Sequence, residues 1–114
     1  MQTYGHFING EWVESKETIP VLDKYTGEEY ARIGKASKEI VTEAVDQALK
    51  TFQTKKLSPA ERYEILMKAA EIFKERKEKL AMILVREAGK VLKDARQEIE
   101  RGIQTFIASA EEAK

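Results

Sequence analysis

The sequence contains no cysteine and only one histidine among its 114 residues. Without cysteine, the chain can form neither a disulfide framework nor a thiolate metal site, and it offers no cysteine nucleophile. The lone His6 excludes a multi-histidine metal site within one chain. These two absences remove several common metal and covalent chemistries before any motif is considered.

Long apolar runs are also missing. The longest one, residues 81–85, is far shorter than the roughly 20 residues that a membrane-spanning helix needs. The first ten residues have neither the basic n-region nor the apolar h-region of a signal peptide. We therefore expect a cytoplasmic protein with no membrane partner.

No sign of charge dominates, because the 20 Lys and Arg residues balance the 20 Asp and Glu residues. This balance argues against a general electrostatic attraction to nucleic acid, so we expect no nucleic-acid partner. Hydrophobic residues make up 42% of the chain, which is close to the value for globular proteins. A chain of this length is enough for one domain.

Residues 1–35 predict two short β-hairpin units. Asn9-Gly10 is the preferred pair for a two-residue type I′ turn, because both positions require positive φ. A second hairpin is predicted from residues 19–22 and 29–34, joined by a turn at residues 23–27. Pro20 cannot donate a backbone hydrogen bond, so its strand belongs at a sheet edge or at a strand start.

Residues 37–114 predict three or four amphipathic helices. Ser37 begins the first one, whose apolar stripe indicates one buried face and consists of Ile40, Val41, Ala44, Val45, Ala48, Leu49 and Phe52. Ser58, Pro59 and Glu61 form the signature of a capping box with proline at the first helical position. The charged residues 75–79 predict a break, and hence two helices at about 59–76 and 77–88.

Gly89 ends the second of these helices, because glycine adopts the left-handed conformation at little cost. The last helix is predicted from residues 91–114, with apolar residues three and four positions apart. Gly102 within it lowers helix propensity, and such a residue often allows another element to pack closely.

No catalytic constellation emerges from the residue types. Gly89-Lys90 is similar to the end of a phosphate-binding loop, but Leu84 and Val91 occupy positions that the loop reserves for glycine and Ser or Thr. The pair is better explained as a helix end. Ser37 and Ser58 are explained as helix caps and not as nucleophiles.

Two further groups of residues leave a choice open. His6 is either a strand residue whose ring nitrogens are hydrogen-bonded or a catalyst. Trp12 and Tyr30 are either packing residues or a shelf for a ligand.

Four carboxylates on the last predicted helix are expected to form a solvated acidic face, because no histidine lies near them in the sequence. They are Glu98, Glu100, Glu111 and Glu112. The sequence therefore assigns no catalytic, cofactor-binding or metal-binding residue.

Five short motifs nevertheless occur in a recognisable order. They are FINGEW at 7–12, DKYTGE at 23–28, AVDQALKTF at 44–52, a spaced pattern from Glu61-Arg62 to Leu80-Ala81, and EAGK at 87–90 followed by Ala95, Glu98 and Ile99. In this order and spacing they resemble the N-terminal segment of the NAD(P)-dependent aldehyde dehydrogenase superfamily. The match departs from the family at Asp23-Lys24, where Asn-Pro is usual, and at Val91, where proline is usual.

The resemblance implies an α/β enzyme that oxidises an aldehyde to a carboxylic acid through a thiohemiacetal and hydride transfer to NAD or NADP. Residues 1–114 would be a single segment, a mainly helical fragment that forms the N-terminal part of the cofactor-binding domain. The family's catalytic cysteine, glutamate base, oxyanion asparagine and glycine turn lie downstream. The segment itself is therefore expected to be inactive and to bind no cofactor.

The resemblance also bears on metals and partners. Some relatives hold a monovalent cation at positions that match the Leu22 main chain and Glu98, but we assign no cation to this chain. The expected partners are the remainder of the parent chain, the parent's aldehyde substrate and further copies, because bare apolar faces favour a homo-oligomer. The alternative is a free-standing helical module that self-associates without catalysis.

Overall fold

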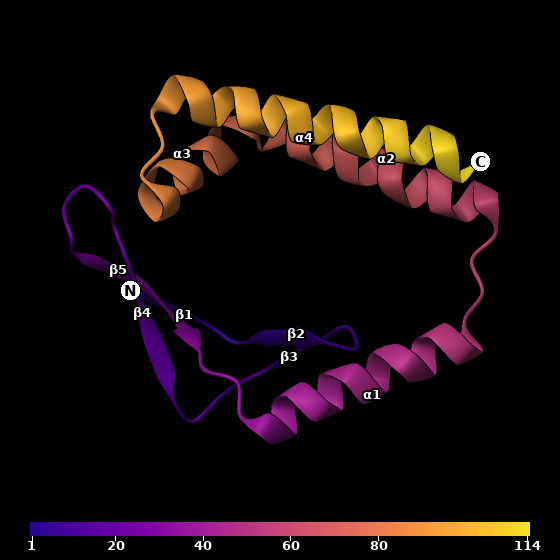
Figure 1. Ribbon diagram of the computed structural model, residues 1–114, viewed down its shortest axis with the longest axis horizontal. Coiled ribbons are helices and arrows are strands. Elements are labelled where there is room, and N and C mark those ends of the chain that lie inside the picture. The colour runs from indigo at the N-terminus through magenta and orange to yellow at the C-terminus, as the bar shows by residue number, and fades with distance from the viewer. The chain divides into compact units, whose positions relative to one another are not determined.

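The computed structural model describes all 114 residues, and it divides them into two compact units, Met1–Lys56 and Leu57–Lys114 (Figure 1). The first unit contains all five strands and one helix: β1 (Gln2–Tyr4), β2 (His6–Ile8), β3 (Glu11–Val13), β4 (Thr18–Leu22), β5 (Glu29–Gly34) and α1 (Lys38–Thr54). The second contains three helices: α2 (Pro59–Glu75), α3 (Lys77–Ala88) and α4 (Leu92–Ala113). The predicted fold class, a mainly helical chain preceded by short strands, is confirmed.

The first hairpin is the one that the sequence predicts. Strands β2 and β3 pair in antiparallel register, with Phe7 opposite Trp12. Asn9 and Gly10 both have positive φ, at 52° and 77°, as a type I′ turn requires. The Phe7 and Trp12 rings lie 5.1 Å apart between centroids, so the cross-strand pair adds an aromatic contact to the hairpin.

Strands β4 and β5 also form the predicted hairpin, within a sheet of order β1-β5-β4. Pro20 lies on β4, an edge strand, as its missing N–H demands. Gly27, at φ 75°, ends the connecting turn, where the Asp23 carboxylate accepts hydrogen bonds from two backbone N–H groups. This turn fixes the register of the two strands.

Strand β1 is an element that the sequence does not predict. It pairs in parallel with β5, and Gln2 lies opposite Ala31. All three of its residues are exposed, so buried and exposed positions do not alternate along it. Gly5 then lets the chain pass close to β3, since a Cβ there would lie 2.5 Å from the Val13 carbonyl oxygen.

Helix α1 begins at the predicted cap, where the backbone N–H of Ile40 donates to the Ser37 hydroxyl over 3.1 Å. The prediction of a buried face on this helix, however, is wrong for this chain. None of its residues is buried, and Val45 and Phe52 are 61% and 73% exposed. The β2–β3 hairpin faces only the flank of α1 that carries Ala44 and Ala48, so the larger apolar residues beside that flank stay bare.

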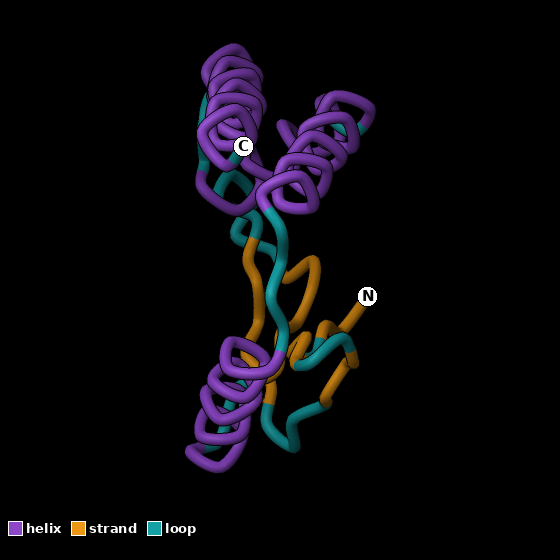
Figure 2. Tube along the Cα trace, turned by 90° about the vertical axis from the view of Figure 1, so that its right-hand side faces the viewer, coloured by secondary structure: helices purple, strands orange, loops and turns teal.

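The second unit has its own core. Helices α2 and α4 pack side by side, and α3 packs against α4 (Figures 1 and 2). The buried side chains are those of Ala70, Ala81, Ala95, Ile103 and Ala110. Because four of the five are alanine, the helix backbones approach one another closely. The Phe73 and Phe106 rings, 4.9 Å apart, extend this contact between α2 and α4.

Local signals set the helix ends of this unit as predicted. The Ser58 hydroxyl and the Glu61 carboxylate each accept a hydrogen bond from the other's backbone N–H, which completes the capping box. The break falls at Arg76, and Gly89 ends α3 with φ 68°. No other element packs closely on Gly102, because a Cβ there would meet no heavy atom within 4 Å.

None of the four helices combines the length and apolarity that a bilayer-spanning segment requires.

Candidate functional site

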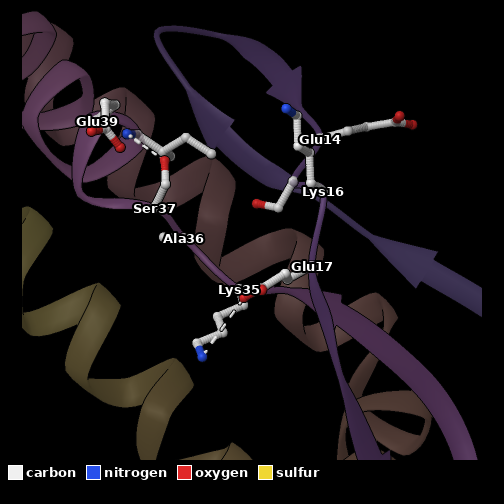
Figure 3. Close-up of a pocket in the computed structure, with 9 residues that line it drawn as sticks. Glu14, Lys16, Glu17, Lys35, Ala36, Ser37 and Glu39 are labelled. Atoms are coloured by element: carbon white, nitrogen blue, oxygen red, sulfur yellow. Dashed lines mark hydrogen bonds and ion pairs between the residues drawn. The ribbon is translucent and has the colours of Figure 1, made fainter.

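A hollow of about 580 Å³ in the first unit is lined mostly by polar and charged side chains. Its walls are the connection from β3 to β4, the connection from β5 to α1 and the first turn of α1 (Figure 3). The lining includes three carboxylates, from Glu14, Glu17 and Glu39, and two ammonium groups, from Lys16 and Lys35. The hollow is thus mixed in charge with a slight acidic excess.

Several polar groups of this hollow take part in local interactions. Lys35 Nζ lies 3.8 Å from Glu17 Oε2, and both side chains are well exposed to solvent. The Ser37 hydroxyl caps α1 and is therefore occupied by a backbone N–H. The hollow contains no buried charged or polar side chain that would hold a ligand in one orientation, so it lacks the character of a catalytic pocket.

His6 and Ser15 form a close pair beside the hollow. His6 Nε2 and Ser15 Oγ lie 2.6 Å apart and are partly buried. The pair fits over Gly34, where a Cβ would lie 3.0 Å from both atoms. The sequence does not indicate this partner, because the two residues meet only once β2 and the segment after β3 come together.

A histidine–serine pair could in principle be a base and a nucleophile. Nucleophilic catalysis also needs a group that orients the base and donors that stabilise an oxyanion. No acidic side chain hydrogen-bonds to His6, whose hydrogen bond to Ser15 instead ties β2 to the chain that follows β3. The His6–Ser15 pair therefore has a structural role and lacks the groups that catalysis requires.

The two aromatic residues considered as a ligand shelf lie on different sheets. Trp12 is on β3, is 66% exposed, and contacts the Phe7 ring in a tilted arrangement. Tyr30 is on β5 and half-buried. The first unit therefore does not combine them into a single platform on one sheet.

Two of the four carboxylates predicted to form a solvated acidic face, those of Glu98 and Glu100, instead form ion pairs with lysines. Glu98 pairs with Lys90 over 2.6 Å, and Glu100 pairs with Lys77 over 2.9 Å. Both carboxylates are half-buried, whereas Glu111 and Glu112 are exposed as predicted. Both lysines lie outside α4, so the spacing of residues along that helix does not indicate these pairs.

A third ion pair joins α3 to α4 through a fork of hydrogen bonds. Arg96 Nε donates to both Glu78 oxygens over 3.1 and 3.2 Å, and the terminal nitrogen of the same guanidinium adds another bond. This hydrogen bonding lowers the pKa of Glu78 and raises the pKa of Arg96. The hydrogen bond from Lys77 likewise lowers the pKa of Glu100.

The two positions that the family resemblance links to a monovalent cation both contact lysine. The Leu22 carbonyl accepts a hydrogen bond from Lys24 Nζ over 2.9 Å, and the Glu98 carboxylate pairs with Lys90. An ammonium group already supplies positive charge at each oxygen. The chain also has no cluster of three or more histidine, aspartate or glutamate side chains that could hold a metal ion.

Comparison with known proteins gives the context that the local geometry lacks. The model of the aldehyde dehydrogenase family matches residues 12–114. The 3-sulfolactaldehyde dehydrogenase of Priestia megaterium is 45% identical over 114 residues, which are 100% of this chain and 24% of that protein. The lactaldehyde dehydrogenase of Methanocaldococcus jannaschii is 43% identical over 105 residues, 91% of this chain and 22% of that protein.

Solved structures agree with these matches. Aldehyde dehydrogenase 21 of Physcomitrella patens, crystallised with the reaction product succinate, superposes with a TM-score of 0.91 at 32% identity. That match covers 97% of this chain and 24% of the other. The betaine aldehyde dehydrogenase of Staphylococcus aureus, in complex with NAD⁺, gives a TM-score of 0.84 at 25% identity, over 91% and 22% of the two chains. The chain thus spans about a quarter of the length of the relatives that it matches.

Proposed function

Because the chain belongs to the aldehyde dehydrogenase family, we propose that it forms the N-terminal part of an enzyme that oxidises an aldehyde to a carboxylic acid. The observation that carries the proposal is the match to 3-sulfolactaldehyde dehydrogenase, which extends over 100% of this chain at 45% identity. The fold agrees independently, since the backbone superposes on a family member with a TM-score of 0.91.

The names of the relatives narrow the proposed substrate and cofactor. They are dehydrogenases of 3-sulfolactaldehyde, lactaldehyde, malonate semialdehyde and succinate semialdehyde, which are short aldehydes with a polar or acidic group. We propose a substrate of the same chemical class. One structural relative is in complex with NAD⁺, and a relative from Saccharomyces cerevisiae is named for NADP⁺, so the proposed hydride acceptor is NAD or NADP.

The residues of this chain do not fit the dinucleotide itself. The sequence has no glycine-rich phosphate turn, and the hollow beside α1 is lined by more carboxylates than ammonium groups, which disfavours a pyrophosphate. The chain also has no cysteine to add to the aldehyde carbon. We propose that these 114 residues are inactive alone and that the cofactor and substrate bind to the rest of the enzyme, in a cytoplasmic homo-oligomer.

The alternative of a free-standing self-association module has less support. It rests on the exposed apolar residues of α1, but a surface feature does not account for identity that runs along the whole chain. The dehydrogenase proposal accounts for both observations, since a segment of a larger chain retains faces that the larger chain covers.

A chimera tests the proposal. This chain would replace the matching quarter of the P. megaterium enzyme, and NAD(P)H formation would be measured with 3-sulfolactaldehyde. We expect the chimera to retain activity, and the isolated 114-residue chain to show none. The P. megaterium enzyme without its N-terminal quarter is the control. A folded but inactive chimera, or turnover by the isolated chain, would contradict the proposal.

A further inference from the structure

The turn between β2 and β3 contains the only asparagine of the chain, Asn9, and glycine follows it directly. In such a pair the backbone nitrogen of the glycine can attack the amide carbon of the asparagine side chain and release ammonia. Glycine allows this reaction best because it has no Cβ to obstruct the approach. Both residues are exposed to solvent, so water and hydroxide have access to the turn.

The two groups that would react are not held by other interactions. The Asn9 side-chain amide and the Gly10 N–H form no hydrogen bond, since the hairpin bonds join the flanking residues, Ile8 and Glu11. A Cβ built on Gly10 would meet no heavy atom within 4 Å, which shows that the surroundings of its nitrogen are open. Neither hydrogen bonds nor packing therefore protect the pair.

The turn also lies beside positive charge. A hollow of about 500 Å³ separates it from the C-terminal half of α1 (Figure 1). Its lining contains Asn9, Gly10 and the ammonium-bearing residues Lys50 and Lys55, and no carboxylate. Positive charge at this place favours both the deprotonated nitrogen that attacks and the carboxylate that the reaction produces.

The closed turn nevertheless holds the reacting atoms apart. The first central residue of a type I′ turn has ψ of about +30°, the mirror image of type I. At this angle the Cβ of Asn9 points nearly opposite to the Gly10 nitrogen about the Cα–C bond. Ring closure thus requires a rotation that opens the turn, which the strand pairing and the Phe7–Trp12 contact oppose.

We propose that Asn9-Gly10 is a site of spontaneous covalent modification whose rate is limited by opening of the β2–β3 hairpin. The Gly10 nitrogen loses its proton to hydroxide and forms a bond to the Asn9 Cγ. The bond from Cγ to the side-chain nitrogen breaks, and that nitrogen takes up a proton from water and leaves as ammonia. Water then opens the cyclic imide, so the net change is water consumed and ammonia released, without oxidation or reduction.

The two products of ring opening differ in their effect on the hairpin. Aspartate keeps the backbone, and Asp-Gly is itself a preferred pair for this turn. Isoaspartate routes the backbone through the side chain and adds a methylene group to the turn. Since a two-residue turn sets the register of its strands, isoaspartate should separate Phe7 from Trp12. Either product places a new negative charge beside Lys50 and Lys55.

The reaction needs nothing outside these 114 residues, so the isolated chain is suitable for the test. The chain would be incubated at mildly alkaline pH and body temperature, and sampled over several weeks by mass spectrometry. We expect a mass increase that corresponds to replacement of NH by O, confined to the tryptic peptide of residues 1–16, with isoaspartate among the products. Asn9→Gln is the matched control and should show no increase, because its longer side chain would have to close a six-membered ring. An unaltered chain that keeps its mass would overturn the site.

Two comparisons test whether hairpin opening limits the rate. The chain unfolded in guanidinium chloride should lose ammonia at least about tenfold faster than the folded chain. Trp12→Ala, which removes the aromatic contact, should accelerate the folded chain about two- to tenfold. Tyr25→Ala is its matched control, since Tyr25 is 95% exposed in the other hairpin, and should leave the rate unchanged. Equal rates in the folded and unfolded chains would overturn the role of the hairpin, and this comparison holds even if Trp12→Ala does not fold.

Discussion

Ile103 is the largest fully buried side chain in the structure, and its truncation tests how the second unit is held together. The other buried residues of the second unit, Ala70, Ala81, Ala95 and Ala110, are all alanines, so Ile103 is the one large side chain that is fully buried there. An Ile→Ala change at such a site costs about 2–5 kcal/mol. A unit of this size has a stability of roughly 3–9 kcal/mol. Ile103→Ala should therefore remove a large share of the unit's stability, or all of it.

The assay is urea unfolding followed by far-ultraviolet circular dichroism, because the second unit consists of helices. Ile103→Val should cost about 0.5–1.5 kcal/mol and shift the melting temperature by roughly 2–12 °C. Ile65→Ala is the matched control, since Ile65 lies on α2 and is 53% exposed. That variant should cost less than about 1 kcal/mol. If Ile65→Ala destabilised the chain as much as Ile103→Ala, the assignment of the core would be wrong.

Two further predictions concern α4 and its ion pair with α3. Gly102→Ala should stabilise the isolated chain by up to about 1 kcal/mol, because alanine favours the helix and its Cβ meets no atom within 4 Å; an unchanged or lower melting temperature would contradict this. The hydrogen bond from Arg96 lowers the pKa of Glu78 from its ordinary 4.5, so the stabilisation is fully present above pH 4.5 and is lost as the pH falls through the lowered pKa. Melting temperatures measured from pH 4.5 downward should fall less for Glu78→Gln than for the unaltered chain. If the two melting temperatures fell equally with pH, the contribution of the Glu78–Arg96 pair to stability would be refuted.

Local chemistry made much of the fold predictable. The Asn9-Gly10 turn, the capping box at Ser58 and the left-handed Gly89 each involve residues within a few positions of one another. The structure confirms all three. Pro20 likewise placed its strand at an edge, because a missing N–H has the same consequence in any sheet.

The features that the sequence did not reveal depend on distant parts of the chain. Strand β1 has no alternating pattern, and it exists only because β5 offers it a free edge. The apolar pattern of α1 indicated that one face seeks burial, but periodicity does not say which polypeptide covers it. The family could be predicted from motif order, whereas the partner of His6 could not, because nine residues and a turn separate it from Ser15.

The parallel pairing of β1 has a consequence for the order of folding. The hairpin of β2 and β3 closes a short loop, from Phe7 to Trp12, while the contact between Gln2 and Ala31 closes a loop about six times longer. The longer closure costs roughly 1.5 kcal/mol more in chain entropy. Strand β1 should therefore attach last and detach first, so that the amide of Thr3 exchanges with solvent well before those of the β4–β5 pair. The N-terminal strand would then be the last strand to join the sheet, after β4 and β5 have already paired.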